Sequence, residues 1–213
     1  MDQGALIGTP AVPAQAIDYA WAMDPAAAEP PPRCDSATRR RIIETACALG
    51  VPRDYGRSRG LQPVREPARL TAIGVDVHGR MQWLVPRAAA AWKRMHAAAL
   101  GEGIELEVVS AFRSAEYQLG ILQRKLERGL TIEGILRVSA APGYSEHHSG
   151  RVLDLTTPGS EPLEESFEQT PAFAWLQRNA GRFGFHLSYP RGNPHGIAYE
   201  PWHWCWHHRP RNQ

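Results

Sequence analysis

The stretch SEHHSGRVLDL, residues 145–155, places an imidazole and a carboxylate at a spacing suited to metal chemistry. His147 precedes Asp154 along the chain, and Gly150 between them permits the sharp turn that would bring the two side chains together. Imidazole and carboxylate are two of the ligand types of a catalytic zinc ion, which takes three protein ligands and leaves a fourth position to water. Taken alone, this spacing is equally compatible with a His-Asp pair of structural function.

A second stretch, YEPWHWCWHH at residues 199–208, contains groups that would complete such a site. His203 could supply the third ligand, while Glu200, three residues earlier, would lie near the reacting water as a general base. The alternative for this stretch is an aromatic strand that contains histidines without a chemical role. The two stretches together favour a metal site, and Cys205 is interpreted as a bystander thiol.

The remaining histidines near these stretches are expected to lie outside the ligand set. His148 should point away from its neighbour His147, because successive side chains of an extended backbone face opposite ways. Surface or tail positions are expected for His186, His195, His207 and His208.

The elements that must position these groups are predicted from hydrophobic periodicity, capping residues and turn residues. Helices are predicted at residues 35–49, 86–101, 114–129, 131–137 and 170–184. Strands are predicted at residues 104–112, 149–155, 185–189 and 199–206, together with a hairpin at 69–85. Helices combined with mostly hairpin-connected strands predict an α+β fold, a single domain with a central antiparallel sheet flanked by helices.

The length of 213 residues is sufficient for one hydrophobic core with a small extension. Residues 1–33, rich in Ala and Pro, are predicted to form an arm, residues 34–66 a helix and loop extension, and residues 67–213 the main domain. The first thirty residues lack the basic and continuous apolar segments of a secretory signal peptide.

Composition excludes several classes of function. A formal charge of +2 gives no basis for nucleic-acid binding, which needs a strongly basic face. No apolar stretch approaches the length of a membrane span, and three cysteines are too few for a disulfide framework. We expect a monomer.

The two stretches resemble the signature pair of a known family, the zinc D-Ala-D-Ala carboxypeptidases, which include the vancomycin-resistance D,D-carboxypeptidases. This family belongs to the lysostaphin, D-Ala-D-Ala metallopeptidase and hedgehog superfamily. The first signature is matched by Ser145-x-His147-x-x-Gly150-x-Val152-x-Asp154 and the second by Glu200-Pro201-Trp202-His203. Further segments at 110–118, 142–150 and 183–193 resemble the same family in the same order, so the resemblance covers about residues 70–206.

The resemblance implies a role for each matching residue and a zinc cleft on the sheet. One Zn²⁺ per chain would be held by His147, Asp154 and His203, with Glu200 as the general base. Arg113 would bind substrate or stabilise the oxyanion, since its cationic fork suits a terminal carboxylate or a developing negative charge. Polar positions of the substrate cleft are matched, in addition, by Gln118 and Ser145.

The function implied by the resemblance is hydrolysis of the terminal D-Ala-D-Ala bond of peptidoglycan stem peptides. Two alternatives stay open: a D,D-dipeptidase or stem-peptide endopeptidase of the same fold, and a non-catalytic zinc domain that binds wall fragments. The chain departs from related sequences at Trp204-Cys205-Trp206, where an Arg-Tyr pair is common, and at Val152, where Ala is common. The substrate would place the protein in the cell envelope, with a cytoplasmic role on recycled wall peptides as the alternative.

Overall fold

The computed structural model describes residues 29–207 of the chain. Most of the predicted N-terminal arm, and the tail residue His208, lie outside this range, and the predicted domain boundaries stay predictions. The α-helices are α1 (Ser36–Ala48), α2 (Tyr55–Ser58), α3 (Pro86–Gly101), α4 (Ala115–Glu127), α5 (Ile132–Arg137) and α6 (Pro171–Asn179). The 3-10 helices are η1 (Glu146–Ser149), η2 (Glu165–Gln169) and η3 (Ala180–Phe183). The strands are β1 (Thr71–Val75), β2 (Met81–Leu84), β3 (Glu107–Ser110), β4 (Val152–Thr156), β5 (Phe185–Leu187) and β6 (His203–Trp206).

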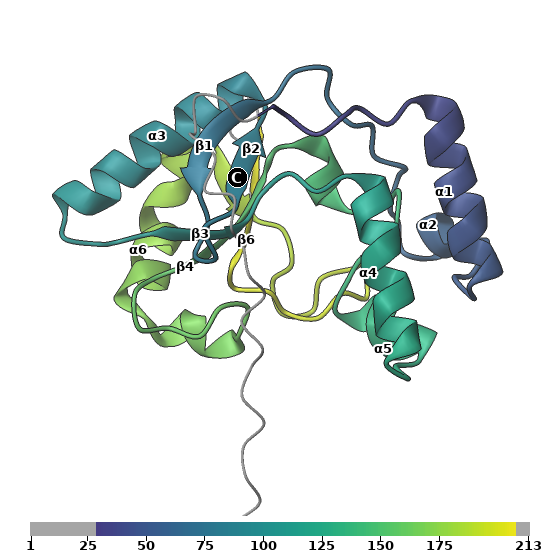
Figure 1. The fold of residues 1–213 in the computed structure, drawn as a ribbon. Helices are drawn as coiled ribbons and strands as arrows, with labels where there is room; N and C mark the ends of the chain where they lie inside the picture. Colours follow the sequence, from purple (N-terminus) through teal and green to yellow (C-terminus); the bar gives the residue numbers. More distant parts are fainter. Residues whose placement is uncertain (1–28, 208–213) are drawn as a thin grey trace, which may run out of the picture.

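The strands form an antiparallel sheet with the order β3-β4-β6-β5, and β1 and β2 pair separately as the predicted hairpin. In Figure 1, α3 and α6 lie on one side of the molecule, and α1, α2, α4 and α5 gather on the other. These observations confirm the predicted α+β fold with a central antiparallel sheet flanked by helices. No helix among residues 29–207 is long and apolar enough to cross a membrane.

The last predicted strand is shorter than the sequence indicates. Residues 199–206 were predicted as a single strand, but only His203–Trp206 pair with neighbours as β6. Pro201 cannot donate to a sheet ladder, and the backbone N–H of His203 instead closes a turn onto the carbonyl of Glu200 at 3.1 Å. Glu200 therefore lies on a turn at the end of the sheet, beside the first residue of the strand.

Two hydrophobic clusters support the two halves of the molecule. The larger cluster packs the sheet against α3 and α6 and includes Met95, Leu153 and Trp204, and the smaller one packs α4 and α5 against α1 through residues such as Ala46 and Leu122. Successive side chains of β6 point to opposite faces of the sheet, so residues that pack in the core alternate with residues on the other face. Trp204 and Trp206 enter the larger cluster, whereas His203 faces the other side of the sheet.

The start of α4 is fixed by two side chains. Ser114 is the N-cap residue and accepts a hydrogen bond from the backbone N–H of Tyr117 at 3.1 Å. The carboxylate of Glu66 accepts the N–H of Ala115 at 2.7 Å, which places a negative charge at the positive end of the helix. Since Arg113 directly precedes this cap, its position is fixed between β3 and α4.

Candidate active site

Three predicted ligands from two segments of the chain meet at the end of the sheet. Asp154 on β4 and His203 on β6 are directly paired across the two strands, and His147 lies on η1, the turn that leads into β4. The Nε2 atom of His147 lies 3.1 Å from Asp154 Oδ2, and the Nδ1 atom of His203 lies 3.2 Å from Asp154 Oδ1. One ligand atom from each residue lies within 4.8 Å of the other two, and all three residues are buried.

The turn between His147 and Asp154 depends on Gly150, as expected. Gly150 has a φ of +63°, in the left-handed region that favours glycine. A Cβ atom at this position would lie 3.0 Å from Leu70 Cδ2 and 3.3 Å from Val85 Cγ1. The glycine lets η1 close against the hairpin before β4 begins.

Hydrogen bonds to the remaining ring nitrogens fix the orientation of both imidazoles. His147 Nδ1 lies 2.6 Å from the carbonyl oxygen of Ala111, and His203 Nε2 lies 3.1 Å from Glu146 Oε2. His147 Nδ1 donates to its carbonyl partner and Nε2 faces Asp154. With a metal ion bound, His203 Nε2 would donate to Glu146 and leave Nδ1 available as a ligand atom. A carbonyl or carboxylate behind each histidine is the arrangement that orients metal-binding imidazoles.

Electrostatics around the cluster favour a cation. Burial would raise the pKa of Asp154, but His147 and His203 hold it well below its usual value, so its side chain is a carboxylate. Burial would likewise lower the pKa of His203, yet the surrounding carboxylates of Asp154, Glu146 and Glu200 raise it well above its usual value. Three carboxylates around one buried imidazole create a strongly negative position.

The donor set fits a catalytic zinc ion. Asp154 Oδ1 is buried and makes no hydrogen bond among residues 29–207, and its contact with His203 Nδ1 at 3.2 Å is an ion pair only. A buried carboxylate oxygen without a hydrogen bond is costly, and a bound cation would offset that cost. Two imidazoles and one carboxylate match the three-ligand type of catalytic site, in which one position stays open to water or substrate. The residues that would hold the ion are His147, Asp154 and His203.

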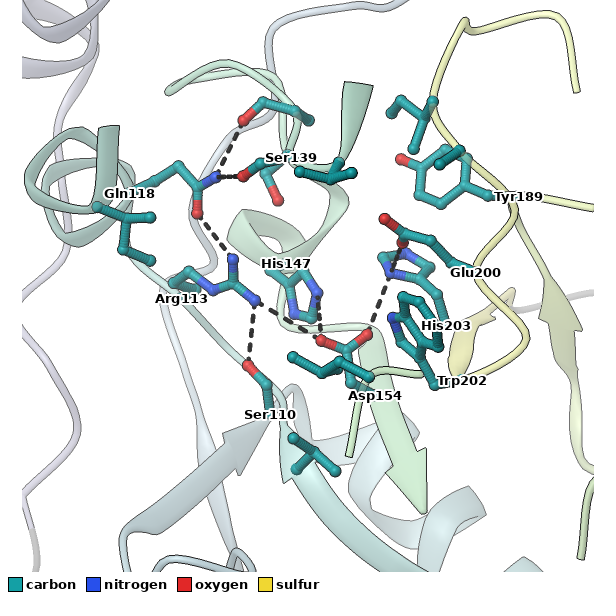
Figure 2. A pocket seen from close by; sticks show the side chains of 18 of the residues that line it. Ser110, Arg113, Gln118, Ser139, His147, Asp154, Tyr189, Glu200, Trp202 and His203 are labelled. Carbon is teal, nitrogen blue, oxygen red and sulfur yellow. Dashed lines mark hydrogen bonds and ion pairs between the residues drawn. The ribbon is translucent and has the colours of Figure 1, made fainter. Parts of the chain in front are cut away.

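Glu200 lies beside this cluster rather than within it. Its Oε2 atom is 3.3 Å from His203 Nδ1, and its side chain lines a cleft of about 660 Å³ that also contains the three predicted ligands. Figure 2 shows Glu200, His203 and Tyr189 on one side of the cleft, Arg113 and Gln118 on the other, and His147 and Asp154 between them. A carboxylate next to the cluster but outside it has the placement of a general base.

Arg113 reaches the cluster from the opposite side. Its Nη2 atom lies 3.6 Å from Asp154 Oδ2 and 3.3 Å from Ser110 Oγ, and Nη1 donates to Gln118 Oε1 at 2.9 Å. Only 19% of the Arg113 side chain is exposed, which distinguishes it from a surface ion pair. A guanidinium held this close to the ligand set can stabilise negative charge that develops on a substrate oxygen.

Gln118 and Ser145 both line the cleft, where the sequence placed them. The amide of Gln118 is fully used within the protein, because its Nε2 atom donates to Ser139 Oγ at 2.8 Å and to the carbonyl of Ala140 at 2.9 Å. Its oxygen accepts from Arg113. Gln118 therefore positions the guanidinium, and its predicted contact with substrate stays a prediction.

Sequence reasoning missed two residues that support the site. Glu146, adjacent to a predicted ligand in the sequence, accepts from His203 across 57 positions of chain, and hydrogen bonds lower its pKa to about 2 although burial acts to raise it. Tyr189 packs against His203 with ring centres 4.6 Å apart and the ring planes tilted by 53°. Both residues lie in segments that resemble the family, at 142–150 and 183–193, so the sequence could have marked them as candidates. Their contacts with His203 could not be read from the sequence, because they depend on how distant segments meet in the fold.

His148 points away from the cluster as predicted, and its own role was not foreseen. Its Nδ1 atom lies 2.6 Å from the carbonyl of Arg113, and its Nε2 atom accepts the N–H of Gly143 at 3.1 Å. Burial lowers the pKa of His148 to about 3, so the ring is neutral and Nδ1 donates. The backbone N–H of Arg113 also donates to the carbonyl of His147 at 3.3 Å. These bonds join η1 to the segment that carries the guanidinium.

The other expected bystanders lie outside the ligand set. Cys205 is buried on β6 and does not belong to the metal-ligand cluster found among the described residues. His186 and His195 do not line the cleft, and His195 Nδ1 lies 2.9 Å from the carbonyl oxygen of Arg59.

Comparison with known proteins identifies relatives of the whole site region. The sequence profile of the VanY family, described as D-alanyl-D-alanine carboxypeptidase, matches residues 81–209, more than half of the chain. The YodJ protein of Bacillus subtilis is 35% identical over 129 residues, which make up 57% of this chain and 45% of YodJ. The chain thus spans less than half the length of this relative.

Solved structures share the fold. The LdcB LD-carboxypeptidase has a TM-score of 0.60 at 32% identity, covering 68% of this chain and 71% of LdcB. VanYB in complex with D-Alanine-D-Alanine has a TM-score of 0.54 at 25% identity, with 68% of this chain and 81% of VanYB covered. A mutant of the D,D-pentapeptidase VanY in complex with Zn(II) has a TM-score of 0.52 at 26% identity, with coverages of 66% and 82%.

Proposed function

The chain belongs to the D-alanyl-D-alanine carboxypeptidase family, and we propose that it is a zinc peptidase that removes the terminal D-Ala of peptidoglycan stem peptides. The observation that carries the proposal is the meeting of His147, Asp154 and His203 in one cleft with Glu200 and Arg113 on either side. The zinc complex of a VanY neighbour supports the choice of metal. The complex of VanYB with D-Alanine-D-Alanine supports the class of substrate.

In the proposed mechanism, zinc would supply Lewis-acid polarisation of the scissile carbonyl and make a water molecule more acidic. Glu200 accepts a proton from the attacking water and later passes this proton to the leaving amine. Arg113 stabilises the negative charge that develops on the carbonyl oxygen, since its Nη2 atom lies beside Asp154. Gln118 and His148 keep the guanidinium in place from its side chain and its backbone, respectively.

A second candidate substrate is a peptide whose terminal D-Ala follows an L-residue. The similarity to LdcB, named as an LD-carboxypeptidase, favours this candidate. Both reactions release one D-Ala from a free carboxyl end, so the same proposed residues would perform them. They differ only in the stereochemistry of the residue that supplies the scissile carbonyl.

Product analysis by mass spectrometry tests the proposal. The purified, zinc-loaded protein is given a stem pentapeptide ending in D-Ala-D-Ala and a tetrapeptide ending in an L-residue followed by D-Ala. Release of one D-Ala from the pentapeptide supports the proposed function, whereas release only from the tetrapeptide favours the second candidate. Release of intact D-Ala-D-Ala, or an internal cut, would overturn both in favour of a dipeptidase or an endopeptidase. Binding without any turnover would favour a wall-binding domain.

Glu200→Gln provides the matched catalytic variant. It should lower kcat by about 10²–10⁴-fold, since it removes the proton acceptor while retaining the size of the side chain. Zinc content measured by mass spectrometry should stay at the wild-type level because Glu200 is not in the proposed ligand set. Glu44→Gln is the control, an exposed carboxylate on α1 that does not line the cleft. Full hydrolytic rate in Glu200→Gln would refute its role.

A further inference from the structure

The helix α4 places one positively charged side chain, Lys125, in the lining of the cleft. The proposed mechanism gives this side chain no role. Gln118, Ile121 and Lys125 all line the cleft, and their spacing of three and four residues places them on one face of the helix. Gln118 supports Arg113, and Ile121 is apolar. Lys125 is therefore the charged group of this face.

The ammonium of Lys125 has no bonded partner within the described part of the chain. It is half-buried, and no hydrogen bond or ion pair to its ammonium occurs among residues 29–207. Burial lowers the pKa of Lys125, the positive charges of Arg113 and Arg128 act in the same direction, and the negative charge of Glu200 opposes them. A half-buried ammonium without a directly bonded counter-ion is costly, so an anion bound next to it would be stabilised.

The two arginines of the cleft are already committed, and Arg80 forms an ion pair with Asp76 Oδ2 at 2.8 Å. Arg113 donates to Gln118 and Ser110, and its Nη2 atom lies 3.6 Å from a carboxylate oxygen of Asp154. Its place beside the ligand set suits charge that develops at the scissile carbonyl. If Arg113 interacts with the oxygen of the scissile carbonyl, recognition of the free C-terminal carboxylate of the substrate requires a second positively charged group.

The position of Lys125 suits that second group. The Cα atoms of Gln118 and Lys125 are seven residues apart on α4, which corresponds to a rise of about 10 Å along the helix axis. On the substrate, one extended residue spans about 3.5 Å, the separation between the scissile carbonyl and the next position of the peptide. The flexible side chain of Lys125 extends into the cleft, where its charge interacts with those of Arg113 and Glu200. Because Lys125 interacts electrostatically with both Arg113 and Glu200, its ammonium can approach the carboxylate of a single residue that follows a scissile carbonyl bound between them.

We propose that Lys125 forms the positive group of a carboxylate-binding subsite on α4, which takes the free C-terminal carboxylate of the peptide substrate. This inference rests on the proposed function and assigns separate tasks to Arg113 and Lys125. Arg113 serves the reacting oxygen, and Lys125 selects chains that end in a free carboxylate. The subsite would favour removal of a terminal residue over internal cleavage.

The test compares a peptide that has a free C-terminal carboxylate with the same peptide carrying a C-terminal amide. Lys125→Gln should lower kcat/KM for the free acid about tenfold relative to the amide, mainly through KM. Lys125→Arg keeps the charge and should restore most of the preference for the acid. The matched control is Arg128→Gln, which removes an exposed positive charge from the end of the same helix and should retain the wild-type preference.

A loss of similar size for acid and amide in Lys125→Gln, or no loss for the acid, would overturn the subsite. Calorimetric binding to the zinc-loaded Glu200→Gln variant separates this outcome from failure of the proposed function. In that background, adding Lys125→Gln should weaken binding of the acid about tenfold relative to the amide. If the wild-type protein does not hydrolyse the peptide, the proposed function is refuted and the subsite is not. If the zinc-loaded Glu200→Gln variant binds the acid and the amide equally well, the subsite is refuted and the proposed function is not.

Discussion

Two walls of different character face each other across the cleft (Figure 2). The sheet wall consists of His147, Asp154, Glu200 and His203, and each of these side chains has a polar partner within 3.3 Å. The helix wall is the face of α4 that carries Gln118, Ile121 and Lys125. Gln118 is fully bonded, and Lys125 has no bonded partner among residues 29–207.

The difference indicates a division of labour between the walls. The sheet wall is buried, and its groups are fixed by neighbouring strands, which suits chemistry that requires one geometry. Another face of α4 packs into the smaller hydrophobic cluster through Leu119, Leu122 and Leu126, and the helix wall presents the long flexible side chain of Lys125. Changes to the proposed ligands of the sheet wall should therefore affect metal binding, and changes to the helix wall should leave the metal in place while they alter the positioning of Arg113 or the recognition of substrate.

The largest effect is expected at the centre of the sheet wall. Asp154→Asn keeps the size of the buried side chain but removes the charge that faces both imidazoles. Zinc content should fall far below one per chain, and hydrolysis should become undetectable, because the metal requires the anionic ligand. Metal analysis and product analysis on the same sample check this expectation. Stoichiometric zinc in the variant would remove Asp154 from the ligand set.

A smaller loss is expected where the two walls meet. Arg113→Lys keeps one positive charge but loses the fork that contacts Gln118 and lies near Asp154. We expect kcat to fall about 10²–10³-fold with zinc content unchanged. A change in KM alone, with kcat retained, would show that Arg113 holds substrate rather than the reacting oxygen. That result would also reassign the task of Lys125.

The contact behind the sheet wall should influence the metal more than the substrate. Glu146→Gln removes the carboxylate that accepts from His203 Nε2. Zinc affinity, measured by competition with a chelator, should fall about 10–100-fold, the effect typical of a carboxylate behind a metal-binding histidine. Glu116→Gln, in the first turn of α4, is the control. Equal affinity in wild type and Glu146→Gln would contradict this positioning role.

On the helix wall, Gln118→Leu keeps the approximate shape but loses the contact with Arg113. A guanidinium free to move should lower kcat about tenfold, since small displacements of a positioning group are costly to catalysis. Zinc content should match that of the wild type, in contrast to the sheet-wall variants. A loss of metal in Gln118→Leu would break the distinction between the two walls.

The smallest effect is expected at Cys205, which is on the sheet but outside the ligand set. Burial raises the pKa of the Cys205 thiol to about 12, so at pH 8 the thiol stays protonated and unreactive. Cys205→Ala should keep kcat/KM within about twofold of wild type and cost about 1 kcal/mol of unfolding free energy. Iodoacetamide should label the half-buried Cys34 and Cys47 before Cys205. Rapid labelling of Cys205 would contradict the buried position.

The sequence predicted the fold and the central cluster because both depend on local patterns. Periodicity and caps located the α-helices other than the four-residue α2, and the spacing of His147, Gly150 and Asp154 reflects a single turn before a strand. The contact between Glu146 and His203 was not predicted, since it depends on how η1 meets β6. Lys125 was not singled out either, because a charge on a helix ordinarily faces solvent. Its place in the cleft distinguishes it from Lys93, the other lysine of the chain, which is exposed.

The alternation along β6 limits how this protein can change. His203 serves the cleft, while Trp204 and Trp206 pack into the larger hydrophobic cluster. Insertion or deletion of one residue within this strand would shift its register and turn an indole toward the cleft and an imidazole toward the core. The segment from Glu200 to Trp206 can therefore vary by substitution but not in length. Engineering of new specificity is better directed to the helical half, which can be altered without disturbing that register.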